Sequence, residues 1–382
     1  MAKKITLKFN KTTLLILIVV AVILALVVAL AFSPLAQGLI DGINQNAGDL
    51  SNQNNGYGVP QVVQLGGNLS SANSTVILEN VTCKVHFINV GQGDAILCQF
   101  SDGVNVLIDA GSGSTQYPSK EIKDSYLEYL FAVGVTDTID YLIATHPDTD
   151  HYNIFPYVLD SYSVTNIMYN DVVKGTESYE NFKAKANDEV ANASNLRKID
   201  ADGEIYDNYI SGNGYEIDVY APGYSTFQDD DPAFDSEESN GMSPIILLTV
   251  SSRKILLTGD ATFETENWFI NELGESALDI DVLKVGHHGA AGSTGEEFLQ
   301  KISAEYAIIS SDEGGAYAHP RPELMTRLFN AGVVTYRTSR HGSIILNVDE
   351  SGDFAFQVEN EVMVENNTKG INDKMLITQS AD

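Results

Sequence analysis

The chain has 382 residues, of which 43% are hydrophobic and 9% aromatic, and its 22 Lys and Arg stand against 52 Asp and Glu for a formal net charge of −30. This composition supports a sizeable core and excludes a disordered chain, while only two cysteines exclude a disulfide scaffold and a four-thiolate zinc site. So acidic a body repels polyphosphate and argues against a protein that coats nucleic acid, but not against a small, locally neutral site.

The N-terminal segment predicts where the chain lies in the cell. Residues 14–32 form an unbroken apolar run that follows four lysines, Lys3, Lys4, Lys8 and Lys11. A helix of this length matches the ~30 Å hydrocarbon core of a bilayer, and the lysines favour the cytoplasmic side. We therefore expect a basic cytoplasmic segment at 1–12, a single-pass membrane anchor at 13–32 and an extracellular body. Secretion after cleavage at the A-x-A-like site Ala29–Ala31 is the alternative.

The remaining chain divides by composition into three parts. Residues 33–78 are rich in Asn, Gln, Gly and Ser and show no hydrophobic period, which predicts a flexible linker. Strand-like and helical patterns then fill residues 79–358, the expected catalytic domain. Residues 359–382 lose periodicity again and are interpreted as a C-terminal tail.

In chain order, the domain alternates predicted strands with predicted helices. Strands are predicted at 81–90, 94–100, 104–111, 139–146, 214–220, 244–250, 253–259, 280–286, 304–310 and 343–348, and helices at 120–134, 261–273, 294–302 and 321–331. Gly91-Gln92-Gly93 predicts a tight hairpin between the first two strands, with Cys83 and Cys98 near each other as a disulfide or as two buried thiols. This order predicts two mixed sheets, packed face to face and covered by helices, in a layered α/β domain.

Three predicted strands end in residues that bind metals. His146, Asp148, Asp150 and His151 follow the strand at 139–146. Two imidazoles and two carboxylates packed this tightly repel each other or stay unsatisfied without a cation. A helix N-cap at Asp148 or Asp150 is the ordinary alternative.

Two further strand ends supply what this segment lacks. Asp260 follows the strand at 253–259, and His287 and His288 follow the strand at 280–286. A turn aspartate and a surface histidine pair are the ordinary explanations for each alone. Three strands that all end in metal-ligand residues are hard to explain separately, and one carboxylate can bridge two cations with the other ligands divided between them. Two cations ~3.5–4 Å apart generate a hydroxide and neutralise charge on the oxygens of an ester.

Taken together, these motifs resemble those of a known family. The segments FINVGQGDAIL, VNVLIDAG, THPDTDH, ILLTGD and LKVGHHG look like the metallo-β-lactamase fold, and more narrowly like the metallo-β-lactamase-like domain of ComEC-type competence proteins and their stand-alone relatives. The similarity runs from about residue 82 to residue 348. It implies a four-layer αββα sandwich. The superfamily's usual H-x-H-x-D-H appears with Asp148 in the second position, a variant common in the ComEC-like branch.

The resemblance implies roles for the matching positions. His146 and Asp148 would hold one metal, Asp150 and His151 the second, and Asp260 would bridge them. His288 would complete the second site, and His287 would be its neighbour or a substrate contact. Asp109 would orient the loop from behind. The expected metal ligands are thus His146, Asp148, Asp150, His151, Asp260 and His288, and the expected catalytic residues are Asp150, Asp260 and His287. The cofactors would be two divalent ions, either Zn²⁺ or, because carboxylates are numerous, Mn²⁺.

The C-terminal part of the domain suggests a substrate. Four of the six arginines lie at 321–340, and residues 301–340 hold five basic against four acidic residues, a net charge of +1. Pairing with surface acids is one interpretation, and a phosphate clamp beside the metals is the other. The branch's Asn-x-x-Ser element looks like Asn240 to Ser243, where many superfamily members carry a histidine ligand. The expected substrate-binding residues are Asn240, Ser243, His319, Arg337 and Arg340.

These observations predict an exported, membrane-tethered, metal-dependent hydrolase that acts on phosphodiesters such as extracellular DNA or phosphate-bearing envelope polymers. One alternative is a hydrolase of a non-phosphate ester, amide or lactam on the same scaffold. The other is a non-enzymatic competence or envelope binding protein with a vestigial site. The expected partners are the phosphoester and the bilayer at 14–32, without an obligate protein partner. With one apolar segment, the chain is not expected to conduct DNA by itself.

Overall fold

The computed structural model describes residue 78 and residues 80–360, except residue 114 and the stretches 172–175, 191–194, 227–235, 275–277, 313–314 and 316. The predicted anchor at 13–32 lies outside the described residues, as do nearly all of the predicted linker and tail. Within the described part of the chain, no helix is both long enough and apolar enough to cross a membrane.

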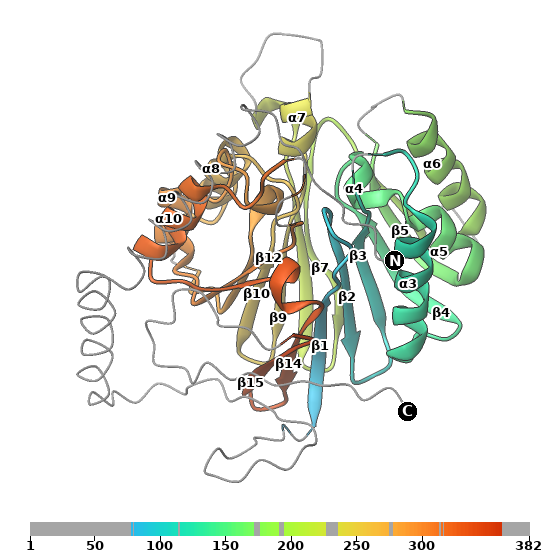
Figure 1. Cartoon of the computed structure of the whole chain (residues 1–382), viewed down its shortest axis with the longest axis horizontal. Coiled ribbons are helices and arrows are strands. Elements are labelled where there is room, and N and C mark those ends of the chain that lie inside the picture. The colour runs from blue at the N-terminus through green and yellow to red at the C-terminus, as the bar shows by residue number, and fades with distance from the viewer. Residues whose placement is uncertain are drawn as a thin grey trace, which may run out of the picture. The chain divides into compact units, whose positions relative to one another are not determined.

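Two β-sheets form the centre of the fold, with helices on both outer sides (Figure 1). The eight-stranded sheet has the order β15-β14-β1-β2-β3-β4-β5-β6, and the seven-stranded sheet has the order β13-β12-β11-β10-β9-β8-β7. The strands of the first sheet are β1 (Val81–Phe87), β2 (Ala95–Phe100), β3 (Asn105–Ala110), β4 (Thr138–Ala144), β5 (Ser163–Asn170), β6 (Leu196–Ile199), β14 (Ile344–Asp349) and β15 (Phe354–Val358). Those of the second are β7 (Glu204–Gly212), β8 (Tyr215–Ala221), β9 (Ile245–Val250), β10 (Arg253–Leu257), β11 (Val282–Lys284), β12 (Tyr306–Ile309) and β13 (Val334–Arg337).

The helices form the two outer layers. Beside the eight-stranded sheet lie α3 (Lys120–Ala132), α4 (Thr149–Tyr152), α5 (Phe155–Ser161) and α6 (Glu177–Glu189). Beside the seven-stranded sheet lie α8 (Phe263–Glu272), α9 (Glu296–Ile302) and α10 (Pro322–Asn330). The shorter helices are α7 (Ser236–Gly241), α11 (Thr338–His341), η2 (Tyr224–Thr226) and η3 (Gly286–Gly289).

Three apolar clusters lie between these layers, which confirms the predicted two-sheet α/β sandwich. Strand β3 shows why the core strands read as continuous apolar runs. Val106 and Ile108 point into the cluster between the sheets, whereas Leu107 points into the cluster under the helices. Because successive side chains of a strand alternate faces, a strand buried on both faces needs apolar residues at every position.

All predicted strands and helices are present, but sequence patterning missed the strands β5, β6, β7, β13 and β15 and the helices α4, α5, α6, α7 and α11. Strands β6 and β7 lie at sheet edges and are largely exposed, so they lack the apolar pattern of a buried strand. Strand β13 has only four residues. Short or solvent-facing elements depend on their neighbours for stability more than on their own pattern.

The first hairpin differs in one detail from its prediction. Strands β1 and β2 pair antiparallel, but residues 88–94 connect them in a longer loop than a tight turn. Cys83 and Cys98 are both buried free thiols in the core between the sheets. Burial raises the pKa of the Cys98 thiol to about 12. The pair therefore belongs to the core as two thiols.

Strand direction places the ends of many strands together. Strands β3 to β6 run parallel in one sheet, and β10 to β13 run parallel in the other. Carboxyl ends of parallel strands meet at one edge of a sheet, where ligand sites of such folds gather. The side chains that follow β3, β4, β10 and β11 can therefore lie close together.

Candidate metal centre

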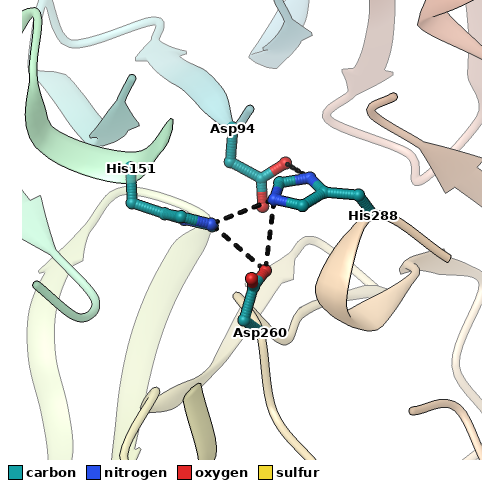
Figure 2. Close-up of side chains that lie close together, drawn as sticks. All are labelled: Asp94, His151, Asp260 and His288. Atoms are coloured by element: carbon teal, nitrogen blue, oxygen red, sulfur yellow. Dashed lines mark hydrogen bonds and ion pairs between the residues drawn. The ribbon is translucent and has the colours of Figure 1, made fainter. Parts of the chain in front are cut away.

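The residues predicted from the three strand ends converge in the folded chain. Asp109 lies near the end of β3, and His146 to His151 follow β4. From the other sheet, Asp260 follows β10 and His288 follows β11. Figure 2 shows His151, Asp260 and His288 pointing toward one another, with Asp94 beside them.

Imidazole nitrogens surround the Asp260 carboxylate at short range. Oδ1 of Asp260 lies 3.2 Å from Nε2 of His151 and 3.5 Å from Nε2 of His288, and these two nitrogens are 3.1 Å apart. Oδ2 of Asp260 lies 3.8 Å from Nε2 of His146 and 3.6 Å from Nε2 of His287. Oδ2 of Asp150 lies 3.4 Å from Nε2 of His288. The arrangement places one carboxylate between two groups of nitrogen and oxygen donors.

The three buried histidines of the centre, His146, His151 and His288, each have a polar partner on Nδ1, so that Nε2 faces Asp260. His151 Nδ1 is 2.7 Å from Oδ2 of Asp109, and His288 Nδ1 donates to the carbonyl of Ser310 at 3.0 Å. His146 Nδ1 lies 3.1 Å from the hydroxyls of both Thr145 and Ser243. Histidines that bind metals are fixed in this way, because a partner on one nitrogen leaves the other free as a ligand.

Both carboxylate oxygens of Asp94 lack hydrogen-bond partners, although Oδ2 pairs with Lys284, and so do two further atoms of this group, Nε2 of His146 and Oδ1 of Asp260. A buried polar atom without a partner is costly, and a divalent cation would satisfy the last two atoms. The buried carboxylates and imidazoles thus fit divalent metal binding, and their mixed oxygen and nitrogen donors suit Zn²⁺ or Mn²⁺.

The protonation of these groups follows from burial and from their neighbours. Burial and the adjacent His151 lower the pKa of His146 to about 4, so this imidazole is neutral at pH 7. Burial alone would lower the pKa of His151, but the carboxylates of Asp260 and Asp109 outweigh it and hold that pKa well above its usual range. Burial alone would raise the pKa of Asp260, but the surrounding histidines hold it well below its usual range. Without metal, a proton on His151 therefore replaces the cation.

A proton at this position gives metal binding a pH dependence. We expect the affinity of the metal-free protein for Zn²⁺ or Mn²⁺ to rise by up to about tenfold per pH unit between about pH 6 and pH 8, because binding must displace the proton from His151. In the metal-free fold, this raised pKa stabilises fully below about pH 6.5, and the contribution is lost as pH rises through the folded pKa. Calorimetric titration at several pH values measures the affinity, and a flat profile would contradict the prediction.

Glycines allow three loops to meet at the centre. A Cβ atom on Gly93 would lie 2.3 Å from the carbonyl oxygen of Gly111, and one on Gly111 would lie 2.1 Å from the carbonyl carbon of Asp150. The backbone amide of Asp94 donates to the carbonyl of Asp150 at 3.0 Å. Only glycine permits such close approach, so the loops after β1, β3 and β4 form one packed unit.

The His287-His288 segment has a strained backbone that its surroundings hold in place. Both residues have left-handed φ angles, 47° for His287 and 52° for His288, which cost on the order of 1–3 kcal/mol each. The amide of His287 donates to the carbonyl of Gly259 at 3.0 Å. The Arg327 guanidinium donates to three carbonyls of the following loop, and the buried carboxylate of Glu266 accepts from the amide of Gly295 at 2.9 Å. These contacts hold both imidazoles beside Asp260.

The ordinary alternatives to metal binding are a helix N-cap at Asp148 or Asp150 and a turn at Asp260. Asp148 is the N-cap residue of α4, but its side chain makes no capping hydrogen bond. The N-cap of α8 is Thr262, so Asp260 does not cap that helix. Asp148 therefore stands at the start of a helix without capping it through its side chain, and Asp260 lies in the turn after β10.

The predicted substrate-binding residues occupy different environments. Ser243 is fully buried, and its hydroxyl contacts His146 and accepts from the amide of Asp260 at 3.2 Å. These contacts place Ser243 against His146, and its role in substrate binding stays a prediction. Asn240 Nδ2 lies 3.3 Å from Nε2 of His287, and the His319 ring lies 5.7 Å from the His287 ring. These two line the approach to His287.

The predicted arginines lie one step further along the same edge. Arg337 ends β13, and Arg340 follows in α11. The Thr338 hydroxyl accepts from the amide of Ser311, which connects β13 to the end of β12 and thus to Ser310 behind His288. Arg337 is buried and Arg340 is half-buried.

Sequence reasoning missed two residues at the centre, Asp94 and Lys284. Both are buried, and Lys284 Nζ lies 2.8 Å from Oδ2 of Asp94. Asp94 directly follows three residues that were interpreted as a turn, and Lys284 is the single charge in the apolar segment VLKVG. A lone charge inside a buried strand was the available signal, because such charges are almost always paired.

Comparison with known proteins agrees with this geometry. The family model described as the metallo-beta-lactamase superfamily matches residues 88–203. ComE operon protein 3 of Bacillus subtilis (strain 168) is 28% identical over 291 residues, which is 73% of this chain and 33% of that protein. Recombination protein 2 of Haemophilus influenzae is 28% identical over 270 residues, which is 71% of this chain and 29% of that protein.

The chain therefore spans about a third of the length of these curated relatives. Among solved structures, Tm1679, a metal-dependent hydrolase of the beta-lactamase superfamily, aligns over 67% of this chain and 95% of that chain, with 10% identity and a TM-score of 0.42.

Proposed function

Because the chain is a metallo-β-lactamase-like protein of the ComEC type, we propose that it is an exported metal-dependent hydrolase that cleaves phosphodiesters. The observation that carries this proposal is the convergence of His146, His151 and His288 on Asp260, with each Nδ1 atom already occupied from behind. In a vestigial site, buried ligand atoms without hydrogen-bond partners would cost stability and serve no function.

The ligands divide between two positions on either side of Asp260. His146 and Asp148 would hold one cation, and Asp150, His151 and His288 the other. Cations bound at such sites lower the pKa of water and neutralise charge that develops on the oxygens of an ester. Asp260 keeps the two positions close together, since it faces both groups of donors.

His287 is the residue best placed to act on the substrate itself. Its side chain is 32% exposed, and its Nε2 atom lies near both the Asp260 carboxylate and the Asn240 amide. We assign His287 to delivery of a proton to the leaving oxygen, because an imidazole open to solvent can both donate and recover that proton. Asn240 and His319 would hold its ring at the working angle.

Phosphodiesters are favoured by the charge near this edge. Residues 301–340 are net positive in a strongly acidic chain, and strands β12 and β13 bring their ends beside the end of β11. Guanidinium groups bind phosphate oxygens in bidentate fashion. Arg337 at the end of β13 and Arg340 in α11 are the candidates, because both lie at this edge.

One set of assays tests the function. Metal-loaded protein is offered bis-p-nitrophenyl phosphate, DNA, a thioester and a β-lactam. We expect turnover of the phosphodiesters, abolished by chelation, and a raised KM for them in Arg337→Gln/Arg340→Gln with little change in kcat. Arg197→Gln, in edge strand β6, is the matched control. Turnover of only the thioester or the lactam would reject the phosphodiesterase, and unchanged kinetics in the double variant would reject the clamp.

We also propose that the domain lies outside the cell, tethered by residues 14–32. The lysines before the apolar run and the acidic body after it support this orientation. Protease added to intact cells with an accessible surface should digest the domain, while a cytoplasmic marker protein stays intact. Complete protection of the domain in the same cells would reverse the assignment.

A further inference from the structure

A buried ion pair joins the two sheets directly behind the proposed metal centre. Asp94 precedes β2 of the eight-stranded sheet, and Lys284 ends β11 of the seven-stranded sheet. Lys284 Nζ lies 2.8 Å from Oδ2 of Asp94 and also donates to the carbonyl of Val285 at 2.9 Å. Both side chains are almost completely shielded, with exposures of 0% and 1%. A charge this deep persists only with a partner, so each residue depends on the other.

Asp94 lies on the opposite side of the His288 ring from the other carboxylates. Its Oδ1 atom is 3.6 Å from Nδ1 of His288, whereas Asp260 faces Nε2 (Figure 2). Asp150 also faces Nε2. Nδ1 already donates to the carbonyl of Ser310. The Asp94 carboxylate therefore faces the Nδ1 side of the His288 ring, whereas the other two carboxylates face its Nε2 side.

Asp94 is nevertheless within reach of the centre. One of its oxygens lies within 4.8 Å of the ligand atoms of His151, Asp260 and His288. Ligand atoms of one ion lie about this far apart, so a small side-chain rotation would let Asp94 bind the cation as well. What opposes this rotation is the Lys284 ammonium, which contacts the same carboxylate.

The charges around the centre support this separation. Five carboxylates gather here, and two of them have cationic or hydrogen-bonding partners away from the cations. Asp109 faces Nδ1 of His151, and Asp94 faces Lys284. The remaining three are Asp148, Asp150 and Asp260. Three carboxylates leave two divalent cations with an excess of positive charge, which stays available for an anionic substrate. A fourth carboxylate would cancel that excess.

We propose that Lys284 is a positioning residue that holds Asp94 out of the metal centre and thereby sets the number of carboxylate ligands. This inference rests on the metal centre of the proposed function. Asp94 and Lys284 would then act on the centre without binding its cations, and this role explains why a lysine is buried at the end of β11.

Mn²⁺ affinity of the metal-free full chain, measured by calorimetric titration, tests the proposal. Lys284→Met keeps the length of the side chain but removes its charge, which frees Asp94. We expect the Mn²⁺ affinity to rise by about tenfold or more, with a changed Mn²⁺ spectrum in electron paramagnetic resonance. Asp94→Asn/Lys284→Met removes both charges and should return the affinity to within about threefold of the natural chain. Lys254→Met, on the neighbouring strand β10, is the matched control.

If the double variant loses a hundredfold or more in Mn²⁺ affinity while its melting temperature is kept, Asp94 is itself a ligand and the proposal fails. An unchanged or lowered affinity in Lys284→Met would also overturn it. Because the double variant leaves no buried charge unpaired, it tests the proposal even where a single variant fails to fold. A natural chain that binds no Mn²⁺ or Zn²⁺ at all would refute the metal centre of the proposed function, which is a different result.

Discussion

Asp260→Asn is expected to lower turnover at least about a thousandfold and to release at least one metal ion, with the fold largely kept. The side chain keeps its shape but loses the charge that faces four imidazoles, with Nε2 distances of 3.2 to 3.8 Å. An uncharged amide cannot hold two cations in close approach. A thousandfold loss corresponds to ~4 kcal/mol of transition-state stabilisation, which a shared ligand can supply.

The measurement combines metal analysis, kcat with bis-p-nitrophenyl phosphate and a melting curve on the purified variant. Asp207→Asn, on the exposed strand β7, controls for loss of an acidic charge from the chain. Full metal content together with near-normal activity in Asp260→Asn would show that the two-metal interpretation is wrong.

Asp109→Asn is expected to weaken metal binding by about 10- to 100-fold, although this residue touches no cation. Oδ2 of Asp109 accepts from the Thr145 hydroxyl at 2.7 Å and contacts Nδ1 of His151 at 2.7 Å. An amide NH₂ at this position would face two donors, so His151 would lose the partner that directs Nε2 into the centre. Leaving buried donors unsatisfied also costs about 1–3 kcal/mol of stability.

This substitution separates orientation from backbone effects. Asp109 has a φ angle of 56°, a left-handed conformation that asparagine adopts as readily as aspartate. Metal affinity by calorimetry and stability by denaturant titration are both required. A variant that binds metal as tightly as the natural chain would show that Asp109 supports the fold alone. The control is Asp140→Asn, because Asp140 accepts from the amide of Asn105 at the far end of β3.

The local sequence is enough to identify several of the residues that meet at this site. The segment from His146 to His151, Asp260 and the pair His287-His288 each follow an apolar strand, and strand ends are recognisable from periodicity. Parallel strands then bring their ends to one edge, so residues distant in the sequence meet. The contacts of Asp94 with Lys284 and of Ser243 with His146 were missed, because these partners are far apart in the sequence.

The sequence by itself determined the layered α/β class, the buried strands and the set of metal-ligand residue types, because burial pattern and donor chemistry are local properties. Only the tertiary structure decided which nitrogen of each histidine faces the centre, that Ser243 lies behind it and that Cys83 and Cys98 are core thiols. It also paired Lys284 with Asp94 across the two sheets. These are contacts between residues far apart in the chain, and a buried charge can select its partner only after the two sheets have packed together.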